Sequence, residues 1–193
     1  MQQALIFIVK TILELYIITF VMRFILQWVR ADFHNPISQF FVRVTNPLVL
    51  PVRRVIPSIS GIDTATIVVI VLLELVVTTV LVNLTCSGSP MFFQLLLLTL
   101  VRIAYLVLRI YLFVILIYVL LSWISPGTYN PAAVLLAKIA EPALRPFRKW
   151  IPLIGGFDLS PLFALIAIQA LTMLLPIGRI VSGMGCFSVT QLM

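Results

Sequence analysis

The chain has 193 residues, of which 62% are hydrophobic and 10% are charged, and its formal net charge is +7. A soluble domain of this length could not bury so much apolar surface, so the composition excludes a soluble globular protein and predicts an integral membrane protein. The positive charge lies in two short stretches between apolar runs, which favours a membrane surface as its counterpart and indicates no direct binding of nucleic acid.

Four apolar runs are long enough to cross a bilayer, and the first is too long for the core of a signal peptide, so we expect it to be retained. The predicted spans are residues 4–28, 64–84, 99–123 and 160–175. The third apolar run already begins at Met91, so residues 91–98 are either an extension of that span or a separate interfacial piece. Residues 177–193 contain glycines and mixed polarity and are expected to be loosely ordered.

A short amphipathic helix is predicted after the first span. Asn35 followed by Pro36 has the form of an N-cap and a proline at the first helical position. The apolar face comprises Ile37, Phe40, Phe41 and Val44, whereas Ser38, Gln39 and Arg43 face the other way. Because a residue before proline avoids the α conformation, Asn46-Pro47 is predicted to end this helix, with one further turn at residues 52–56. Gly61 then provides a turn before the second span.

The segment from Asn35 to Asp63 recurs without a gap 95 positions later, from Asn130 to Asp158. Over the 36 positions from Trp28 to Asp63, 11 residues are identical to their partners, whereas unrelated segments would share about two or three. This pattern predicts an all-α integral membrane protein whose four transmembrane helices form two parallel two-span repeats. Each repeat carries a cytoplasmic, interfacial amphipathic hairpin. The predicted units are residues 1–90 and 91–180, followed by a tail at 181–193.

The hairpins also carry most of the charge. The candidate residues for binding anionic phospholipid headgroups or a membrane protein partner are Arg53, Arg54, Arg145, Arg148 and Lys149. The alternative is that these residues set the topology alone. Because basic loops stay in the cytoplasm, the predicted topology places both termini in the periplasm. Asn35, Asp63, Asn130 and Asp158 are predicted helix caps, and pairing with the neighbouring arginines is the alternative for the two aspartates.

Polar residues also occur near the middle of the spans, where a charge normally needs a partner. The predicted mid-membrane polar cluster consists of Glu14, Glu74, Arg109 and Gln169, since the 95-residue offset pairs Glu14 with Arg109 and Glu74 with Gln169. Its interpretations are a buried ion pair that docks the halves, a path for a proton or cation, or local solutions such as a Lys10–Glu14 pair. Arg102 is expected to reach toward the outer interface.

No catalytic signature is present, and we expect no enzyme activity, no metal site and no cofactor. His34 is interpreted as an interfacial ring. Cys86 and Cys186 both fall on the predicted outer side, where a disulfide between them is one of two alternatives.

The motif NPxSQFxxxxTNPxxxPxRRVIP followed by GxD, with the second copy NP…EPxLRPxRKxIP…GGFDLSP, resembles the bacterial YggT family, also called YlmG. The resemblance covers nearly the whole chain. It implies a small inner-membrane protein without enzyme activity, in a family linked to osmotic stress tolerance and cell division. Plastid relatives are linked to nucleoid distribution and cytochrome assembly. We therefore expect a membrane organiser or assembly accessory, with a small ion conduit or transporter subunit as the alternative and homo-oligomerisation left open.

Overall fold

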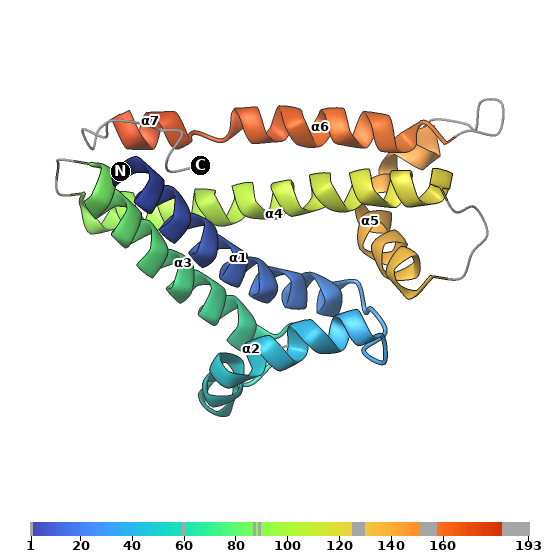
Figure 1. Ribbon diagram of the computed structural model, residues 1–193, viewed down its shortest axis with the longest axis horizontal. Coiled ribbons are helices and arrows are strands. Elements are labelled where there is room, and N and C mark those ends of the chain that lie inside the picture. Colours follow the sequence, from blue (N-terminus) through green and yellow to red (C-terminus); the bar gives the residue numbers. More distant parts are fainter. Residues whose placement is uncertain are drawn as a thin grey trace.

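The computed structural model describes residues 2–58, 61–86, 88, 90–124, 130–150 and 158–182. Within these ranges the regular elements are all helices and there is no strand, which confirms the all-α prediction (Figure 1). The helices are α1 (Gln2–Trp28), α2 (Pro36–Val55), α3 (Thr64–Thr85), α4 (Phe92–Ile124), α5 (Pro131–Trp150), α6 (Ser160–Leu174) and α7 (Ile177–Ser182).

In the part of the chain that the structure describes, four helical stretches are long and apolar enough to cross a membrane. They are Ala4–Trp28, Thr64–Thr85, Phe92–Ser122 and Ser160–Ser182. The last of these continues through Pro176 into α7, so the prediction of a loosely ordered tail from Ile177 is wrong for its first six residues. A proline just ahead of a helix costs nothing there, and Ile177 and Val181 are buried as α7 packs on α4.

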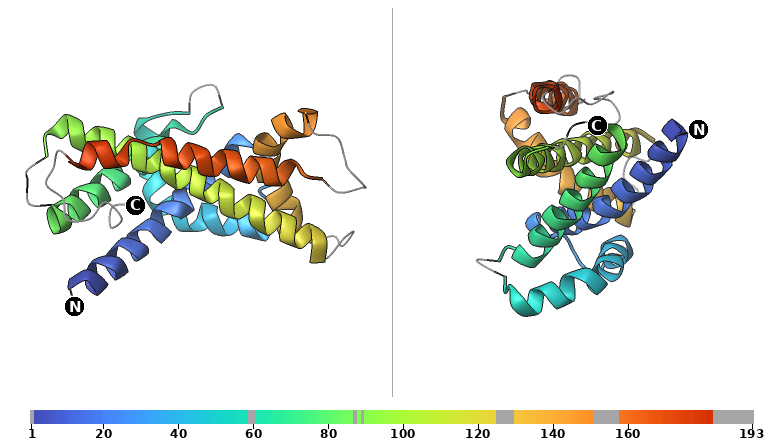
Figure 2. Two further views of the ribbon diagram at one scale, coloured as in Figure 1. Left: turned by 90° about the horizontal axis from the view of Figure 1, so that it is seen from above. Right: turned by 90° about the vertical axis from the view of Figure 1, so that its left-hand side faces the viewer.

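The helices pack in the same pattern in each half of the chain. In the first half α1 packs on α3, with α2 resting against both; in the second half α4 packs on α6, with α5 resting against both. The main contact between the halves is α3 with α4, whereas α1 and α4 touch only slightly. Figures 1 and 2 show α2 and α5 at the ends of the long helices that they connect, away from the start of α1 and the end of α6.

Helix α2 is longer than the sequence predicts. It continues through Pro47 and Pro51, so the prediction that Asn46-Pro47 ends it is wrong. Each proline removes one backbone hydrogen bond, but Thr45 and Val49 on either side of Pro47 are fully buried against neighbouring helices, which holds the chain helical across it. Helix α5 contains its two prolines at the equivalent places and bends visibly along its length (Figure 1).

Helix α4 begins at Phe92, so residues 92–98 extend the third span and are not a separate interfacial piece. Its 33 residues correspond to about 50 Å of helix at about 1.5 Å per residue, more than the roughly 30 Å hydrocarbon thickness requires. Leu98 and Thr99 are fully buried near its start. The extra turns therefore place the middle of the helix further toward the N-terminus than residues 99–123 predict.

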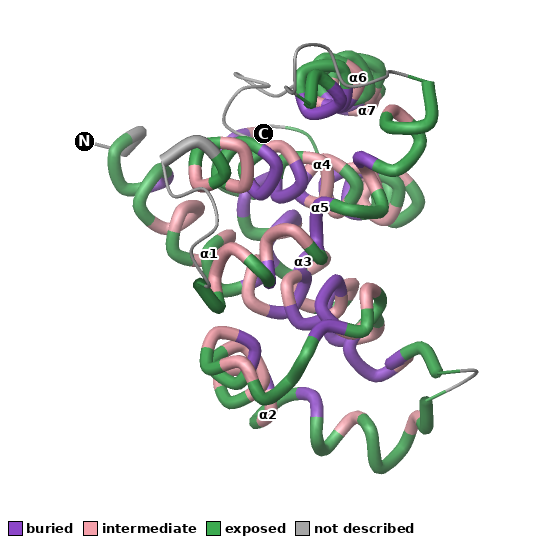
Figure 3. The backbone as a smooth tube through the Cα atoms, turned by 90° about the vertical axis from the view of Figure 1, so that its right-hand side faces the viewer, coloured by how far each residue is buried: buried purple, intermediate pink, exposed green. Residues whose placement is uncertain are grey.

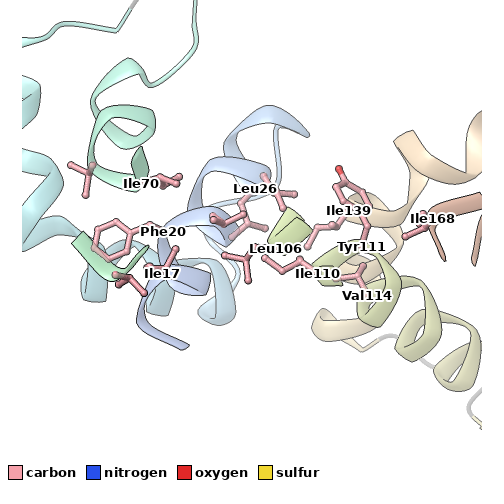
Figure 4. Packing of buried hydrophobic residues seen from close by; sticks show 14 of the residues in the cluster. Ile17, Phe20, Leu26, Ile70, Leu106, Ile110, Tyr111, Val114, Ile139 and Ile168 are labelled. Carbon is pink, nitrogen blue, oxygen red and sulfur yellow. The ribbon is translucent and has the colours of Figure 1, made fainter. Parts of the chain in front are cut away.

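The core runs without interruption from the first pair of long helices to the second (Figure 4). Ile17 and Phe20 meet Ile70 at one end, and Leu106 of α4 lies between them and Ile139 of α5. Figure 3 shows the buried positions where the helices face one another and the exposed positions on their outer sides. Large apolar side chains such as Phe7 (68% exposed) and Met173 (76% exposed) cover those outer sides, as expected where the neighbour is lipid.

Candidate functional site

A buried charge cluster (Lys10, Glu14, Glu74 and Arg102) lies where α1, α3 and α4 converge. The Arg102 Nε donates to Glu74 Oε1 at 2.7 Å, and its Nη2 donates to Glu14 Oε1 at 3.3 Å. Lys10 Nζ lies 3.8 Å from the same Glu14 oxygen. The side chains of Arg102 and Glu74 are 5% and 2% exposed, so this is an ion pair removed from both solvent and lipid.

Of the predicted mid-membrane set, the structure brings Glu14 and Glu74 together at Arg102 and leaves Arg109 and Gln169 outside the cluster. Arg109 is exposed, with its guanidinium carbon 6.0 Å from the centre of the Phe113 ring, and Gln169 is exposed on α6. Arg102 takes the cationic position instead, although the sequence predicts that it reaches outward. The reason is the early start of α4, since ten residues separate Phe92 from Arg102, or about 15 Å along the helix axis.

The signal that could have identified Arg102 is its own isolation in an apolar run. A guanidinium ten residues into a span normally has a carboxylate partner inside the bundle. The 95-residue offset does not reveal Arg102, because it pairs Arg102 with the apolar Phe7 and not with a polar residue. Both carboxylates of the cluster bind Arg102. Because Arg102 on α4 bridges Glu14 on α1 and Glu74 on α3, it holds three helices together.

The first hairpin, comprising α2 and the segment to Asp63, is locked by a second buried carboxylate. Asp63 is fully buried, caps α3 and accepts a hydrogen bond from Thr66 Oγ1 at 2.7 Å. Arg53 donates to the same oxygen, Oδ2, and Arg23 Nε lies 4.0 Å from it. Burial by itself would raise the pKa of Asp63, but the hydrogen bonds from Thr66 and Arg53 and the positive charge of Arg53 outweigh it, and the pKa lies below the usual 3.8.

The second hairpin, comprising α5 and the segment to Asp158, is locked by a different set of partners. Arg148 Nε donates to Asp158 at 3.0 Å and its Nη1 donates to Glu141 at 2.6 Å. Its Nη2 reaches the hydroxyl of Tyr118 at 3.4 Å, so this arginine is held by three side chains. Burial raises the pKa of Asp158, but hydrogen bonds from Ser160 and Arg148 lower it more, leaving it below 3.8.

Of the four predicted caps, Asn35, Asp63 and Asn130 accept a backbone hydrogen bond at the start of their helices, whereas the capping position of α6 is Leu159 and not Asp158. Asn35 accepts from Ile37 N at 2.9 Å, and Asn130 accepts from Ala132 N at 2.9 Å. Asp158 stands one residue before Leu159, the capping position of α6, yet its side chain still accepts from Ser160 N at 2.9 Å. Asp63 therefore both caps a helix and pairs with an arginine, whereas Asp158 pairs with Arg148 and stands one residue outside the capping position. Asn35 also donates to the Pro131 carbonyl at 2.9 Å, which joins the starts of α2 and α5.

The five basic hairpin residues divide into two groups. Arg53 and Arg148 are used in the ion pairs that hold each hairpin. Arg54, Arg145 and Lys149 are exposed and make no ion pair within the ranges that the structure describes. Arg54 and Lys149 adjoin Val55 and Trp150, which are 81% and 86% exposed at the ends of α2 and α5. The second group therefore has no carboxylate partner among the described residues and is exposed to an external ligand at the hairpin ends.

Two further residues bear on the predictions. His34 is exposed and its Nδ1 lies 3.0 Å from Asp32 Oδ1. Cys86, at the end of α3, is disulfide-bonded, whereas Cys186 lies outside the described residues. In the described part of the chain, no three His, Cys, Asp or Glu residues come together in a way that could hold a metal ion.

Comparison with known proteins identifies relatives over nearly the full length. A family model described as CCB3/YggT matches residues 2–84 and, separately, residues 97–179. The chain is 46% identical over 175 residues to an uncharacterized protein of Pseudomonas aeruginosa, covering 90% of this chain and 89% of the relative. It is 35% identical over 172 residues to the protein YggT of Escherichia coli, covering 89% of each. A protein of Vibrio alginolyticus is 40% identical over 167 residues, covering 84% of this chain and 88% of the relative. No solved structure matches.

Proposed function

The chain belongs to the CCB3/YggT family, and from this membership we propose that it is a non-enzymatic organiser or assembly accessory of the bacterial inner membrane. In this role the two hairpins contact anionic phospholipid headgroups and a membrane protein partner. The four membrane-capable stretches hold them in place, with both chain termini on the periplasmic side. The family links to osmotic stress and to cell division supply the phenotypes in which this role is expected to appear.

The observation that carries the proposal is the pairing of basic and apolar side chains at the exposed ends of α2 and α5. Arg54 adjoins the exposed Val55, and Lys149 adjoins the exposed Trp150. Tryptophan and basic residues favour the headgroup region of a membrane, where each Lys or Arg near an anionic surface contributes about 1 kcal/mol. Because Arg53 and Arg148 already hold structural ion pairs, the remaining basic residues are the ones that a lipid or partner would meet.

The second candidate function is a small ion conduit or transporter subunit. The buried charge cluster favours it, because charged side chains within membrane spans often line a path for protons or ions. Against it stands the closed geometry, in which Arg102 is bonded to both Glu14 and Glu74 and Glu74 is only 2% exposed. A buried, fully paired arrangement of this kind supports a role in helix docking.

Complementation of a deletion strain under hyperosmotic stress separates the two candidates. The organiser variant is the triple exchange of Arg54, Arg145 and Lys149 to Ala, which leaves both hairpin ion pairs in place. The matched conduit variant is Arg102→Met with Glu74→Leu, which removes the buried ion pair from both sides and leaves neither charge without its partner. We expect the triple variant to reach the membrane at normal levels but to fail in growth, while the double variant restores growth.

The opposite pattern would refute the organiser role and support the conduit. Affinity capture of the wild-type chain and of the triple variant in mild detergent supplies an independent readout. A partner retained by the wild type and lost by the triple variant supports the proposal. Identical capture by both, together with normal growth of the triple variant, contradicts it.

A further inference from the structure

A cavity of about 470 Å³ lies between the end of α1 and the first hairpin. Three arginines line it together with polar, aromatic and aliphatic side chains: Arg23, Arg43, Arg53, Gln27, Gln39, Phe33 and Val42. Its volume is within the range of sites that hold small ligands, roughly 300–1,000 Å³. The most buried of these side chains is Arg23, which is 5% exposed, whereas Gln39 and Arg43 are exposed. The cavity therefore runs from an accessible rim to a buried cationic wall.

The positive charge of the cavity is only partly compensated. Asp63 is the one carboxylate paired with its arginines among the described residues; it binds Arg53 and lies 4.0 Å from Arg23. The Nη1 of Arg23 donates instead to two neutral acceptors, Thr45 Oγ1 at 2.7 Å and Asn46 Oδ1 at 2.9 Å. Three positive groups against one negative group leave an excess of two charges beside the cavity.

The corresponding part of the second hairpin is neutralised from within the chain. The residues 95 positions after Arg23 and Asn46 are Tyr118 and Glu141. One arginine is thereby lost and one carboxylate is gained, and Glu141 binds Arg148 at 2.6 Å. The second hairpin thus carries its own anion at the place where the first hairpin has a neutral amide and an open cavity.

We propose that this cavity binds a phosphate group, which supplies to the first hairpin the negative charge that Glu141 supplies to the second. Guanidinium groups match phosphate geometry with paired hydrogen bonds, and three of them converge on the cavity. The phosphate belongs either to an anionic phospholipid headgroup or to a soluble phosphate compound. The site goes beyond the organiser role, since it uses Arg23 and Arg43 and not the exposed basic residues at the hairpin ends.

The most informative variant is Asn46→Glu, which places in the first hairpin the carboxylate that the second already has. Arg23 donates to Asn46 Oδ1, so a glutamate there can take the place of the bound anion without leaving a charge unpaired. We expect this variant to unfold at the same temperature as the wild type or higher, and to lose phosphate binding. A loss of binding with retained stability cannot come from misfolding.

A second pair of variants separates this site from general surface charge. Arg43→Gln removes an exposed arginine at the rim of the cavity, and Lys138→Gln removes the residue that stands 95 positions later. Because a hydrogen bond to a charged group contributes about 1.5–3 kcal/mol, we expect Arg43→Gln to weaken binding by about tenfold or more. Lys138→Gln is expected to leave it unchanged.

Binding is measured on the purified full chain with two probes. Native mass spectrometry from nanodiscs counts retained phosphatidylglycerol against phosphatidylcholine, and thermal unfolding in detergent compares inorganic phosphate with chloride at matched ionic strength. Retention of phosphatidylglycerol alone assigns the phosphate to a lipid, a response to inorganic phosphate alone assigns it to a soluble compound, and both together support the shared chemistry. The proposal is overturned if neither probe binds, if Asn46→Glu binds as the wild type does, or if Arg43→Gln and Lys138→Gln weaken binding equally.

Discussion

Removing either partner of the Arg102–Glu74 pair should destabilise the protein far more than removing both. The perturbations are Arg102→Met, Glu74→Leu and the double exchange, with Arg109→Met as the matched control. Arg102 and Glu74 are almost fully buried and 2.7 Å apart, whereas Arg109 is exposed on the same helix. Each single variant leaves one buried charge without its partner inside the bundle, whereas the double variant removes both charges of the pair.

The structure sets the size of each effect. Two charges about 3 Å apart attract by about 5 kcal/mol at an effective dielectric constant of about 20, and breaking a buried pair from one side costs about 3–5 kcal/mol. Arg102→Met falls at the top of this range because Glu74 then has no cation. Glu74→Leu falls at the bottom because Arg102 keeps Glu14 at 3.3 Å. The double variant should regain most of the loss, since Glu14 still has Lys10 at 3.8 Å.

Reversible unfolding by SDS in mixed micelles, followed by far-ultraviolet circular dichroism, measures these free energies. The control Arg109→Met should stay within about 0.5 kcal/mol of the wild type, as exposed substitutions usually do. Strictly additive losses in the double variant would refute the reasoning, because they would show that the two side chains are stabilised independently. Losses below about 1 kcal/mol in both single variants would show that the pair is accessible to water.

Three further predictions concern the hairpins and the outer turn. Because the folded-state pKa of Asp63 lies below 3.8, its pairing with Arg53 should stabilise the fold above about pH 4, and this contribution should be lost as the pH falls through the folded-state pKa. The free energy of unfolding measured from pH 6 to pH 3 should show this loss, and Asp63→Asn should flatten the profile in that range. Gly61 has a φ of +80°, so Gly61→Ala should cost about 1–2 kcal/mol of stability, whereas Gly178→Ala in a helix should cost nothing; equal thermal midpoints would contradict this. Cys86 is disulfide-bonded, so reduction should change the gel mobility of the chain and Cys86→Ser should abolish that change, while a freely alkylated thiol in the untreated protein would disagree.

Local signals in the sequence predicted the parts of the fold that depend on neighbouring residues. Asn35-Pro36 marks a helix start because the cap and the proline act within one turn, and the structure has Asn35 accepting from Ile37 N. The Asn46-Pro47 pair is equally local, yet the helix continues through it. Burial of Thr45 and Val49 against neighbouring helices outweighs the lost hydrogen bond, and this burial is not visible in the sequence.

The charge cluster shows a different limit, because the prediction relied on symmetry between the halves. An offset can pair Glu14 with Arg109, but it cannot show which arginine on α4 faces α1 and α3. That choice depends on where the helix begins and how it is rotated, and the structure selects Arg102. The two glutamates could be predicted because a carboxylate inside a span is costly wherever it lies.

The two halves of the chain share the residues that determine backbone geometry, but they differ in the charged residues around each hairpin. Prolines recur at equivalent places inside α2 and α5, and Asp63 and Asp158 each accept a backbone hydrogen bond at a helix start while binding an arginine. By contrast, the additional charge beside each arginine–aspartate pair differs: it is a second cation, Arg23, near Asp63 in one half and a second anion, Glu141, on Arg148 in the other. The arginine–aspartate ion pair in each half already stabilises its hairpin. The additional charges around that pair are balanced in the second half but in excess in the first, so they do not stabilise the fold equally. A surplus of positive charge beside an open cavity opposes folding unless an anion occupies it, and this cost is the physical reason to seek a ligand at the first hairpin.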